Sequence, residues 1–485
     1  MLKLVLGTSG SGKTTLLYAR IRARAEAGKR SILLVPEQFT SSTEARIYRE
    51  LGDALSGMVE SYSFTSLAEH ILAIEGGAAV QTLTDAGRAV LVRRALEELQ
   101  DNVHYYYRHR RSAAFCQMAA ETIDELKSAG LSGQQLQELA RDCGTESAKL
   151  GELALIFQGY ESLLAGTGMD PADRLELAAD RLEAALARDE LPDFLREREV
   201  FIDEFDTFNA PKKRLMGAML AALPAVTVAL CEDGAPMQPG DLELFSGAKQ
   251  VAAQLRQLAR KNGAQVAAPE LLRRDLRHKD APGLAALTEL LETGSCTPPE
   301  SAPELRLFAA ASREEEARCA AAAIRRLMRQ GVRCGKIAVV CRDISLYRAA
   351  VRYEFRMAEI PLYCDEPTTP EFSAPATAVR ALLALLRGAD MTEQLTVLAK
   401  TGLCDLTEPE VCALENYAYT WSPNAAAWRA EFTKSPRGFG DAELTEEDTQ
   451  NLTRAENARQ NLCGHFTWQA VFATMMEAVT SAKRS

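Results

Sequence analysis

The chain has 485 residues, 47% of them hydrophobic, so it is long enough for about three domains and too apolar to be disordered throughout. Its 56 Lys and Arg against 67 Asp and Glu give a net charge of −11, which excludes a general polyanion binder and leaves only a local patch for nucleic acid. The sequence has no apolar run of about 18 residues, so we expect no membrane span, and we expect no signal peptide. Its eleven Cys include no C-x-x-C pair, so we expect free thiols in a cytoplasmic protein and no cysteine metal site.

The first predicted element is a strand at residues 2–6 that runs directly into a glycine-rich loop. Residues 7–14 read Gly-Thr-Ser-Gly-Ser-Gly-Lys-Thr, the phosphate-binding pattern G-x-x-x-x-G-K-[ST], and a predicted helix follows. We predict that Lys13 reaches the β- and γ-phosphates of a nucleotide and that Thr14 binds Mg²⁺. A Gly/Ser turn that matches by chance is the alternative, and the flanking strand and helix argue against it. The predicted nucleotide contacts in the loop are Gly7, Thr8, Ser9, Gly10, Ser11, Gly12, Lys13, Thr14 and Thr15.

Four further short apolar segments predict buried parallel strands, and helical stretches separate them. Together with residues 2–6 they indicate an α/β fold with a doubly wound parallel sheet. The interval before the fourth strand is strongly helical, and we interpret residues 85–190 as a helical insertion. The further strands are expected at residues 31–35, 59–62, 199–202 and 226–231.

One basic and aromatic run lies inside this predicted insertion. Residues 104–111 read His-Tyr-Tyr-Tyr-Arg-His-Arg-Arg. Tyrosine rings stack on bases and arginines pair with phosphates, so Arg108, Arg110 and Arg111 are candidate contacts for single-stranded DNA. The alternative is a structural run whose tyrosines face the core of the insertion. The sequence favours this alternative, because one run does not make a groove.

The fourth predicted strand ends in two carboxylates, Asp203 and Glu204. A phosphate-binding loop needs an acidic partner on a neighbouring strand to hold Mg²⁺. We therefore predict that Asp203 binds Mg²⁺ with Thr14, and that Glu204 is the general base, catalytic together with Lys13. A buried strand that ends in an acidic turn is the alternative, and the upstream loop favours the functional interpretation.

A Pro-rich segment at residues 296–303 predicts a domain boundary. Beyond it, predicted strands at residues 305–308 and 337–341 flank a helix that begins with a capping box of Ser312 and Glu315, which indicates a second α/β domain. The expected organisation is a motor-like domain at residues 1–295, the start of a second at 304–374, and a helical insertion at 375–485.

Several segments resemble superfamily 1 helicases. Residues 203–206, Asp-Glu-Phe-Asp, are similar to their motif II. Residues 61–68 lie where these enzymes place a DNA-contacting motif, which makes Phe64 and Thr65 candidate DNA contacts. Arg342 matches an arginine that reaches the nucleotide from the second motor domain, and a solvated arginine at a strand end is the alternative. The resemblance implies two P-loop, RecA-like domains, the second incomplete in this chain.

Longer strings are similar to the AddB family, one of the two kinds of subunit in bacterial AddAB (RexAB-like) helicase–nucleases, which process double-strand DNA breaks for homologous recombination. Residues 33–40, Leu-Leu-Val-Pro-Glu-Gln-Phe-Thr, resemble the "VPEQF" segment of the family. Residues 400–403 and 414–417 resemble its "KTGL" and "LENY" segments. The resemblance runs through essentially the whole chain.

This resemblance implies an ATP-binding and ATP-hydrolysing DNA-repair subunit that forms a heterodimer with an AddA-type motor and acts on double-strand ends and single strands. It also implies later motor motifs, a nuclease domain and an iron–sulfur cluster; their residues do not occur in this sequence, so we expect a fragment. Two alternatives stay open: a non-catalytic, nucleotide-binding scaffold that scans DNA, and a stand-alone superfamily 1 helicase. A small-molecule kinase is disfavoured, because such a compact enzyme does not explain the helical insertion.

Overall fold

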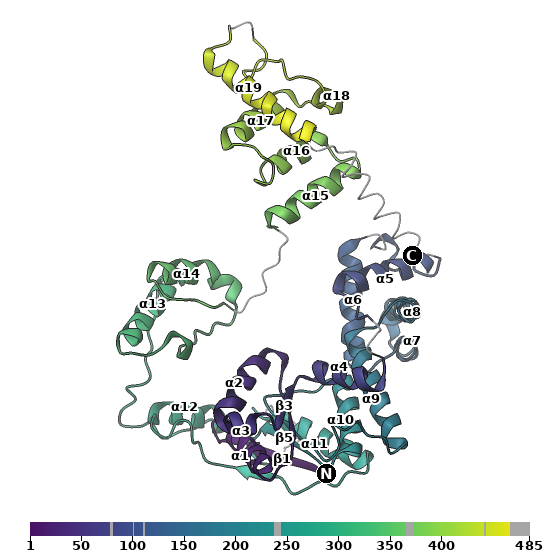
Figure 1. The fold of residues 1–485 in the computed structure, drawn as a ribbon, viewed down its shortest axis with the longest axis vertical. Coiled ribbons are helices and arrows are strands. Elements are labelled where there is room, and N and C mark those ends of the chain that lie inside the picture. Colours follow the sequence, from purple (N-terminus) through teal and green to yellow (C-terminus); the bar gives the residue numbers. More distant parts are fainter. Residues whose placement is uncertain are drawn as a thin grey trace. The chain divides into compact units, whose positions relative to one another are not determined.

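The structure is a computed structural model that describes residues 1–77, 81–99, 101–109, 112–236, 244–364, 372–440 and 443–465. It divides into two compact units, residues 1–307 and residues 308–485 (Figure 1). The three predicted domain ranges, 1–295, 304–374 and 375–485, stay predictions.

The first unit is built on one parallel sheet of six strands in the order β3-β2-β4-β5-β1-β6. The strands are short and largely apolar, as expected for strands that are covered on both faces. The five predicted strands are confirmed, and β6 is an addition that the sequence pattern did not reveal. The strands are β1 (Leu2–Gly7), β2 (Ser31–Leu34), β3 (Val59–Tyr62), β4 (Glu199–Ile202), β5 (Ala225–Cys231) and β6 (Glu270–Leu272).

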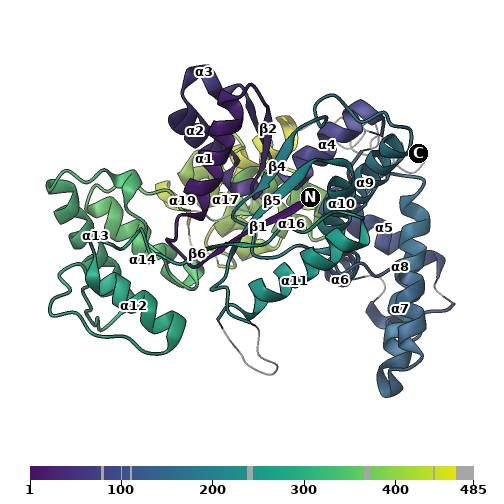
Figure 2. The same ribbon diagram turned by 90° about the horizontal axis from the view of Figure 1, so that it is seen from below.

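Helices cover both faces of this sheet, because alternate residues of a strand point to opposite sides. Val5 and Phe201 share one hydrophobic cluster with Leu17 of α1, whereas Leu4 and Leu6 belong to a second cluster on the other face. Figure 2 shows α1, α2 and α3 on one side of the strands and α10 and α11 on the other. The predicted α/β class with a parallel sheet is therefore confirmed. These helices are α1 (Lys13–Glu26), α2 (Thr40–Leu51), α3 (Asp53–Ser56), α10 (Ala210–Ala222) and α11 (Ser246–Lys261).

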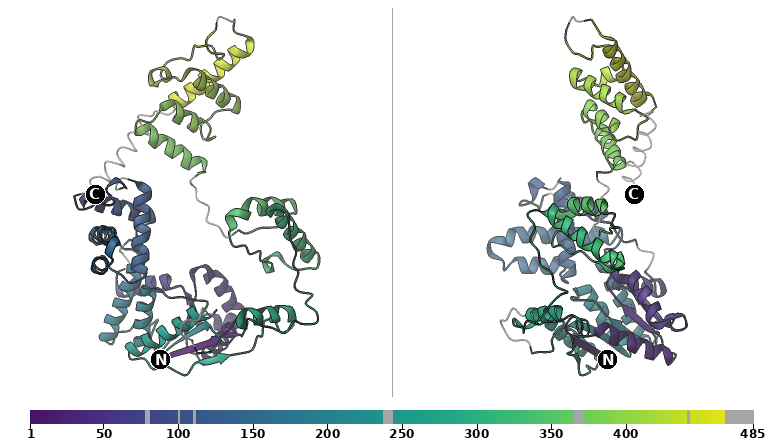
Figure 3. Two further views of the ribbon diagram at one scale, coloured as in Figure 1. Left: turned by 180° about the vertical axis from the view of Figure 1, so that it is seen from behind. Right: turned by 90° about the vertical axis from the view of Figure 1, so that its left-hand side faces the viewer.

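The chain between β3 and β4 is helical, as predicted. The helices α5 to α8 lie together, drawn in blue in Figures 1 and 3. They surround a hydrophobic core of their own, in which Phe157 and Tyr160 are fully buried. In contrast, α9 packs against the sheet core. Asp170, which caps α9, links the two parts because it accepts hydrogen bonds from the Tyr160 hydroxyl at 2.7 Å and from Lys127 Nζ at 2.9 Å. The helices are α4 (Phe64–Glu75), α5 (Asp85–Glu98), α6 (Ala113–Ser128), α7 (Gly133–Ala140), α8 (Ser147–Leu164) and α9 (Pro171–Ala187).

The described residues of the second unit form two hydrophobic clusters. Ile324 and Phe355 lie in the cluster of α13 and α14, and the fully buried Trp428 lies in the cluster of the following helices. The remaining helices, beginning with α12 of the first unit, are α12 (Pro282–Thr293), α13 (Arg313–Arg329), α14 (Ile344–Met357), α15 (Ala374–Leu386), α16 (Met391–Ala399), α17 (Glu408–Trp421), α18 (Ala425–Trp428) and α19 (Glu446–Gln460).

The strands predicted at residues 305–308 and 337–341 are wrong, since neither segment has strand structure. A strand needs a neighbour to pair its backbone groups, and none of the six strands in the described ranges pairs with these segments. Two of their apolar side chains are open to solvent: Leu307 is fully exposed and Val340 is 90% exposed. The helix between them is confirmed as α13, and its Ser312 Oγ accepts the N–H of Glu315 at 3.2 Å.

Candidate nucleotide site

The glycine-rich loop of residues 7–14 connects β1 to α1 at the carboxyl edge of the sheet. Gly10 and Gly12 have φ angles of 79° and 91°, in the left-handed region that glycine enters without strain. A Cβ atom on Gly10 would also lie 2.8 Å from Asp275 Oδ1, so a side chain has no room there. The loop therefore holds its backbone in a tight turn in front of a helix N-terminus, an arrangement that favours an anion.

Lys13 is held against this loop. Its Nζ donates hydrogen bonds to the carbonyl oxygens of Gly7 and Thr8, both at 2.8 Å. Burial lowers the pKa of Lys13 from its ordinary value, and the nearby Cys231 and Asp203 oppose that shift. The ammonium group thus has a defined position at the loop.

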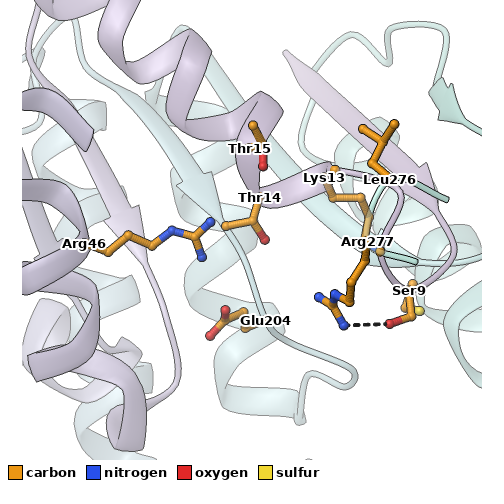
Figure 4. A pocket seen from close by; sticks show the side chains of 11 residues that line it. Ser9, Lys13, Thr14, Thr15, Arg46, Glu204, Leu276 and Arg277 are labelled. Atoms are coloured by element: carbon orange, nitrogen blue, oxygen red, sulfur yellow. Dashed lines mark hydrogen bonds between the residues drawn. The ribbon is translucent and has the colours of Figure 1, made fainter. Parts of the chain in front are cut away.

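Two carboxylates reach the same region from the end of β4. Asp203 is only 5% exposed; burial raises its pKa, and a hydrogen bond with Thr14 opposes the shift. Glu204 has a φ of 66°, and its N–H donates to Asp203 Oδ1 at 3.0 Å. Burial, and then the charge of Asp203, raises the pKa of Glu204. A left-handed non-glycine residue is uncommon. Here the two carboxylates take separate positions: Asp203 is hydrogen-bonded with Thr14, whereas Glu204 lines the cavity. Figure 4 shows Glu204 near Thr14.

A cavity of about 370 Å³ brings most of the predicted nucleotide residues together. In Figure 4, Thr14 and Glu204 lie between Arg46 on one side and Arg277 with Ser9 on the other. Asp203 and the loop residues Gly7, Thr8 and Ser11 do not line the cavity; Ser11 is buried behind it at 3% exposure. The lining residues are Ser9, Gly10, Gly12, Lys13, Thr14, Thr15, Arg46, Glu204, Cys231, Leu276 and Arg277.

Arg277 lines the cavity although no sequence pattern predicted it. It lies in the turn after β6. In this turn the N–H of Leu276 donates to the carbonyl oxygen of Gly10 at 3.0 Å, and Arg277 Nη1 donates to Ser9 Oγ at 3.3 Å. Asp275 fixes this turn by accepting the N–H groups of Arg277 and His278 at 3.0 and 3.1 Å. In the sequence, Arg277 stands out only as part of a basic run at residues 273–279. Nothing in that run indicates that it contacts the glycine-rich loop of residues 7–14.

The predicted DNA contact at Phe64 is not supported by its position. Phe64 is 1% exposed, and its ring lies 5.2 Å from that of Phe205 and 6.0 Å from that of Phe208, between centroids. Thr65 is exposed at the start of α4, and its contact with DNA stays a prediction.

In the basic and aromatic run, Glu152 accepts the backbone N–H groups of His104, Tyr105 and Tyr106 at 2.7, 2.6 and 3.1 Å. This carboxylate fixes the backbone of the run from α8. Arg108 is exposed, whereas Arg110 and Arg111 lie outside the described residues. Arg342 is an exposed residue of the second unit. The predicted roles of these four arginines stay predictions.

A magnesium site would depend on few protein ligands. Within the part of the chain that the structure describes, no three His, Cys, Asp or Glu side chains cluster to hold a metal ion. Thr14 and Asp203 offer a hydroxyl and a carboxylate, and Mg²⁺ commonly combines one or two such ligands with waters and substrate phosphates.

Among the described helices, none has both the length and the apolar character of a membrane span.

Comparison with known proteins gives consistent matches. The family model for the N-terminal part of AddB matches residues 4–288. Relatives named as the B subunits of ATP-dependent helicase/deoxyribonucleases include that of Desulforudis audaxviator, 32% identical over 444 residues, and that of Moorella thermoacetica, 31% identical over 443 residues. Both alignments cover 88% of this chain, but only 37% and 38% of the relatives.

The relative from Clostridium perfringens is 27% identical over 475 residues, which is 95% of this chain and 40% of that protein. The chain therefore spans about two fifths of the length of these relatives. With more than half of its residues matched by the family model, the chain belongs to the AddB family of helicase/deoxyribonuclease B subunits.

Proposed function

We propose that this chain binds Mg²⁺–ATP in the cavity of its first unit, as the ATP-binding AddB component of an AddAB-type helicase–nuclease. The observation that carries the proposal is the meeting of the glycine-rich loop with Asp203 and Glu204 at one edge of the sheet. Their strands, β1 and β4, are separated by β5 alone. Open α/β sheets bind ligands at the carboxyl ends of their strands, so the location supports a RecA-like P-loop site.

The charge of the cavity supports a polyphosphate ligand. Its charged lining residues are three cations, Lys13, Arg46 and Arg277, against the single carboxylate Glu204. The chain as a whole carries a net charge of −11, so this excess of positive charge is local. Together with the helix N-terminus of α1, it favours an anionic ligand with several charges.

The carboxylates then take different tasks. Thr14 and Asp203 would hold Mg²⁺, which neutralises charge on the phosphates when it is bound. Glu204, facing the cavity, would take a proton from the attacking water, and its raised pKa suits a general base better than an ordinary glutamate does. Lys13 would keep the phosphate chain in position.

The wider role follows from the family. The names of the relatives describe one component of an ATP-dependent helicase and deoxyribonuclease. We propose that this chain has the same role as these relatives. It would form a complex with an AddA-type motor and bind DNA ends and single strands during the repair of double-strand breaks. The iron–sulfur cluster and the nuclease domain would lie outside these residues.

The substitution Asp203→Asn tests the magnesium part of the site. We expect the unaltered chain to bind ATP at least about tenfold more tightly with Mg²⁺ than with EDTA, and the variant to lose most of this difference, because a neutral amide is a weaker ligand for Mg²⁺. Titration of a fluorescent ATP derivative under both conditions measures the ratio.

The matched control is Asp193→Asn, which changes a fully exposed aspartate outside the motif and outside the cavity. It should keep the magnesium dependence of the unaltered chain. An equal dependence in Asp203→Asn would remove Asp203 from the metal site.

A further inference from the structure

Arg46 is a cation of the cavity that comes from outside the glycine-rich loop and outside β4. It lies on α2 and faces Thr14 and Glu204 from the side opposite Arg277 (Figure 4). Within the described ranges, its guanidinium group forms no ion pair and no hydrogen bond. This residue of the cavity lining therefore carries N–H donors that no acceptor in the described residues uses.

The guanidinium group is nevertheless held in place. Its central carbon lies 4.8 Å from the centroid of the Tyr18 ring, a cation–π contact. Tyr18 belongs to α1 and is itself 6% exposed, so it is a fixed support. Arg46 is half-buried, unlike the exposed Arg49 one turn further along the same helix. These contacts distinguish Arg46 from a solvated surface arginine.

The nearby carboxylates, Asp203 and Glu204, are not bonded to the guanidinium group of Arg46. Asp203 bonds to Thr14 and to the N–H of Glu204, and neither carboxylate forms an ion pair with Arg46 among the described residues. The positive charge of Arg46 acts on both at longer range, where it opposes the rise of their pKa values that burial causes. The planar fork of an arginine matches two phosphate oxygens, so an entering phosphate group is the partner that fits.

We propose that Arg46 is a specificity-determining ligand of the terminal phosphate, which makes this site bind nucleoside triphosphates more tightly than diphosphates. The inference rests on the proposed function, because it assumes a nucleotide in the cavity. Arg46 lies on the side of Thr14 and Glu204. In the proposed function, the terminal phosphate would meet the attacking water there, and arginines neutralise this phosphate in other phosphoryl-transfer proteins. A diphosphate leaves the group without a partner.

The test is to titrate the chain with Mg²⁺–ADP and with the nonhydrolysable triphosphate AMP-PNP. We expect Arg46→Ala to weaken AMP-PNP binding about tenfold or more, and to change ADP binding by less than about twofold. Arg46→Lys should restore only part of the difference, since lysine supplies a point charge without the fork. Arg49→Ala, on the same helix, is the control that keeps both affinities.

Each other outcome is informative. Equal weakening of both ligands, or no weakening, would overturn the assignment of Arg46 to the terminal phosphate. If Arg46→Ala lowers the unfolding temperature, the effect on binding has to be measured with Arg46→Lys instead. An unchanged preference of Arg46→Lys for AMP-PNP over ADP would also overturn the assignment of Arg46 to the terminal phosphate. If the unaltered chain binds neither ligand, the proposed function fails first, and this result is distinct from a loss of preference alone.

Discussion

Replacement of Lys13 by alanine is expected to abolish measurable Mg²⁺–ATP binding, with a loss of affinity of at least about a hundredfold, or about 3 kcal/mol. The ammonium group lies at the loop that would surround the phosphates, where Nζ is already fixed by two carbonyl oxygens at 2.8 Å. Phosphate oxygens would replace these carbonyls as charged acceptors, and charge-assisted hydrogen bonds are stronger than neutral ones. Isothermal titration calorimetry on the 485-residue chain measures the difference directly.

The control for this substitution is Lys29→Ala, which removes an exposed lysine just beyond the end of α1. It should bind nucleotide like the unaltered chain, and both variants should keep the far-ultraviolet circular dichroism of the original. Binding of ATP by Lys13→Ala at the original affinity would show that the loop has only an architectural role.

Seven of the eleven residues that line the cavity could be predicted from the sequence, because they belong to two local patterns. The glycine-rich loop carries its own strand and helix signals, and Asp203 and Glu204 end an unmistakably apolar strand. In a parallel sheet the carboxyl ends of all strands lie at one edge, so two such ends are expected to meet. The structure places the loop and Glu204 at one cavity, with Asp203 beside Thr14.

Arg46 and Arg277 could not be predicted in this way. Each reaches the cavity through tertiary packing: Arg46 over Tyr18, and Arg277 through a turn that follows a strand of only three residues. Such a short strand gives no periodic pattern, and the partner residues of the turn lie far away in the sequence. No local signal marks which arginine of a basic run will face a ligand.

Composition alone also led to two wrong strand predictions. Residues 305–308 and 337–341 have the apolar and β-branched character of strands, but a strand forms only when another strand pairs with it. Position in a family motif does not fix the exposure of a side chain either, because Phe64 packs against Phe205 and Phe208 instead of presenting its ring to solvent. Strand pairing and ring packing are both contacts that a single segment cannot encode.

Glu204→Gln is expected to bind Mg²⁺–ATP within about twofold of the unaltered chain and to hydrolyse it at least about a hundredfold more slowly, because general bases contribute on this scale. The measurement is a single turnover, with the chain in excess over labelled ATP and without a partner motor. Asp193→Asn, which changes a fully exposed aspartate outside the motif, is the control that keeps the hydrolysis rate.

The pH dependence adds an independent check on the same residue. A general base must be deprotonated, and burial together with the charge of Asp203 raises the pKa of Glu204. The hydrolysis rate should therefore fall as the pH drops through a value above that of an ordinary glutamate, and Glu204→Gln should lack this limb of the profile. Hydrolysis at the original rate by the variant would contradict the general-base role, whereas a large loss of ATP binding would make Glu204 a ligand or a structural residue.

Comparison of the two substitutions separates a motor-like role from a binding-only role. If nucleotide serves only to stabilise the complex with the AddA-type partner on DNA, Lys13→Ala should weaken that complex and Glu204→Gln should leave it unchanged. If hydrolysis at this site contributes to the work of the complex, both substitutions should lower its rate of DNA unwinding, although Glu204→Gln still binds ATP. The two residues lie at one cavity, so the contrast isolates the chemical step from the binding step.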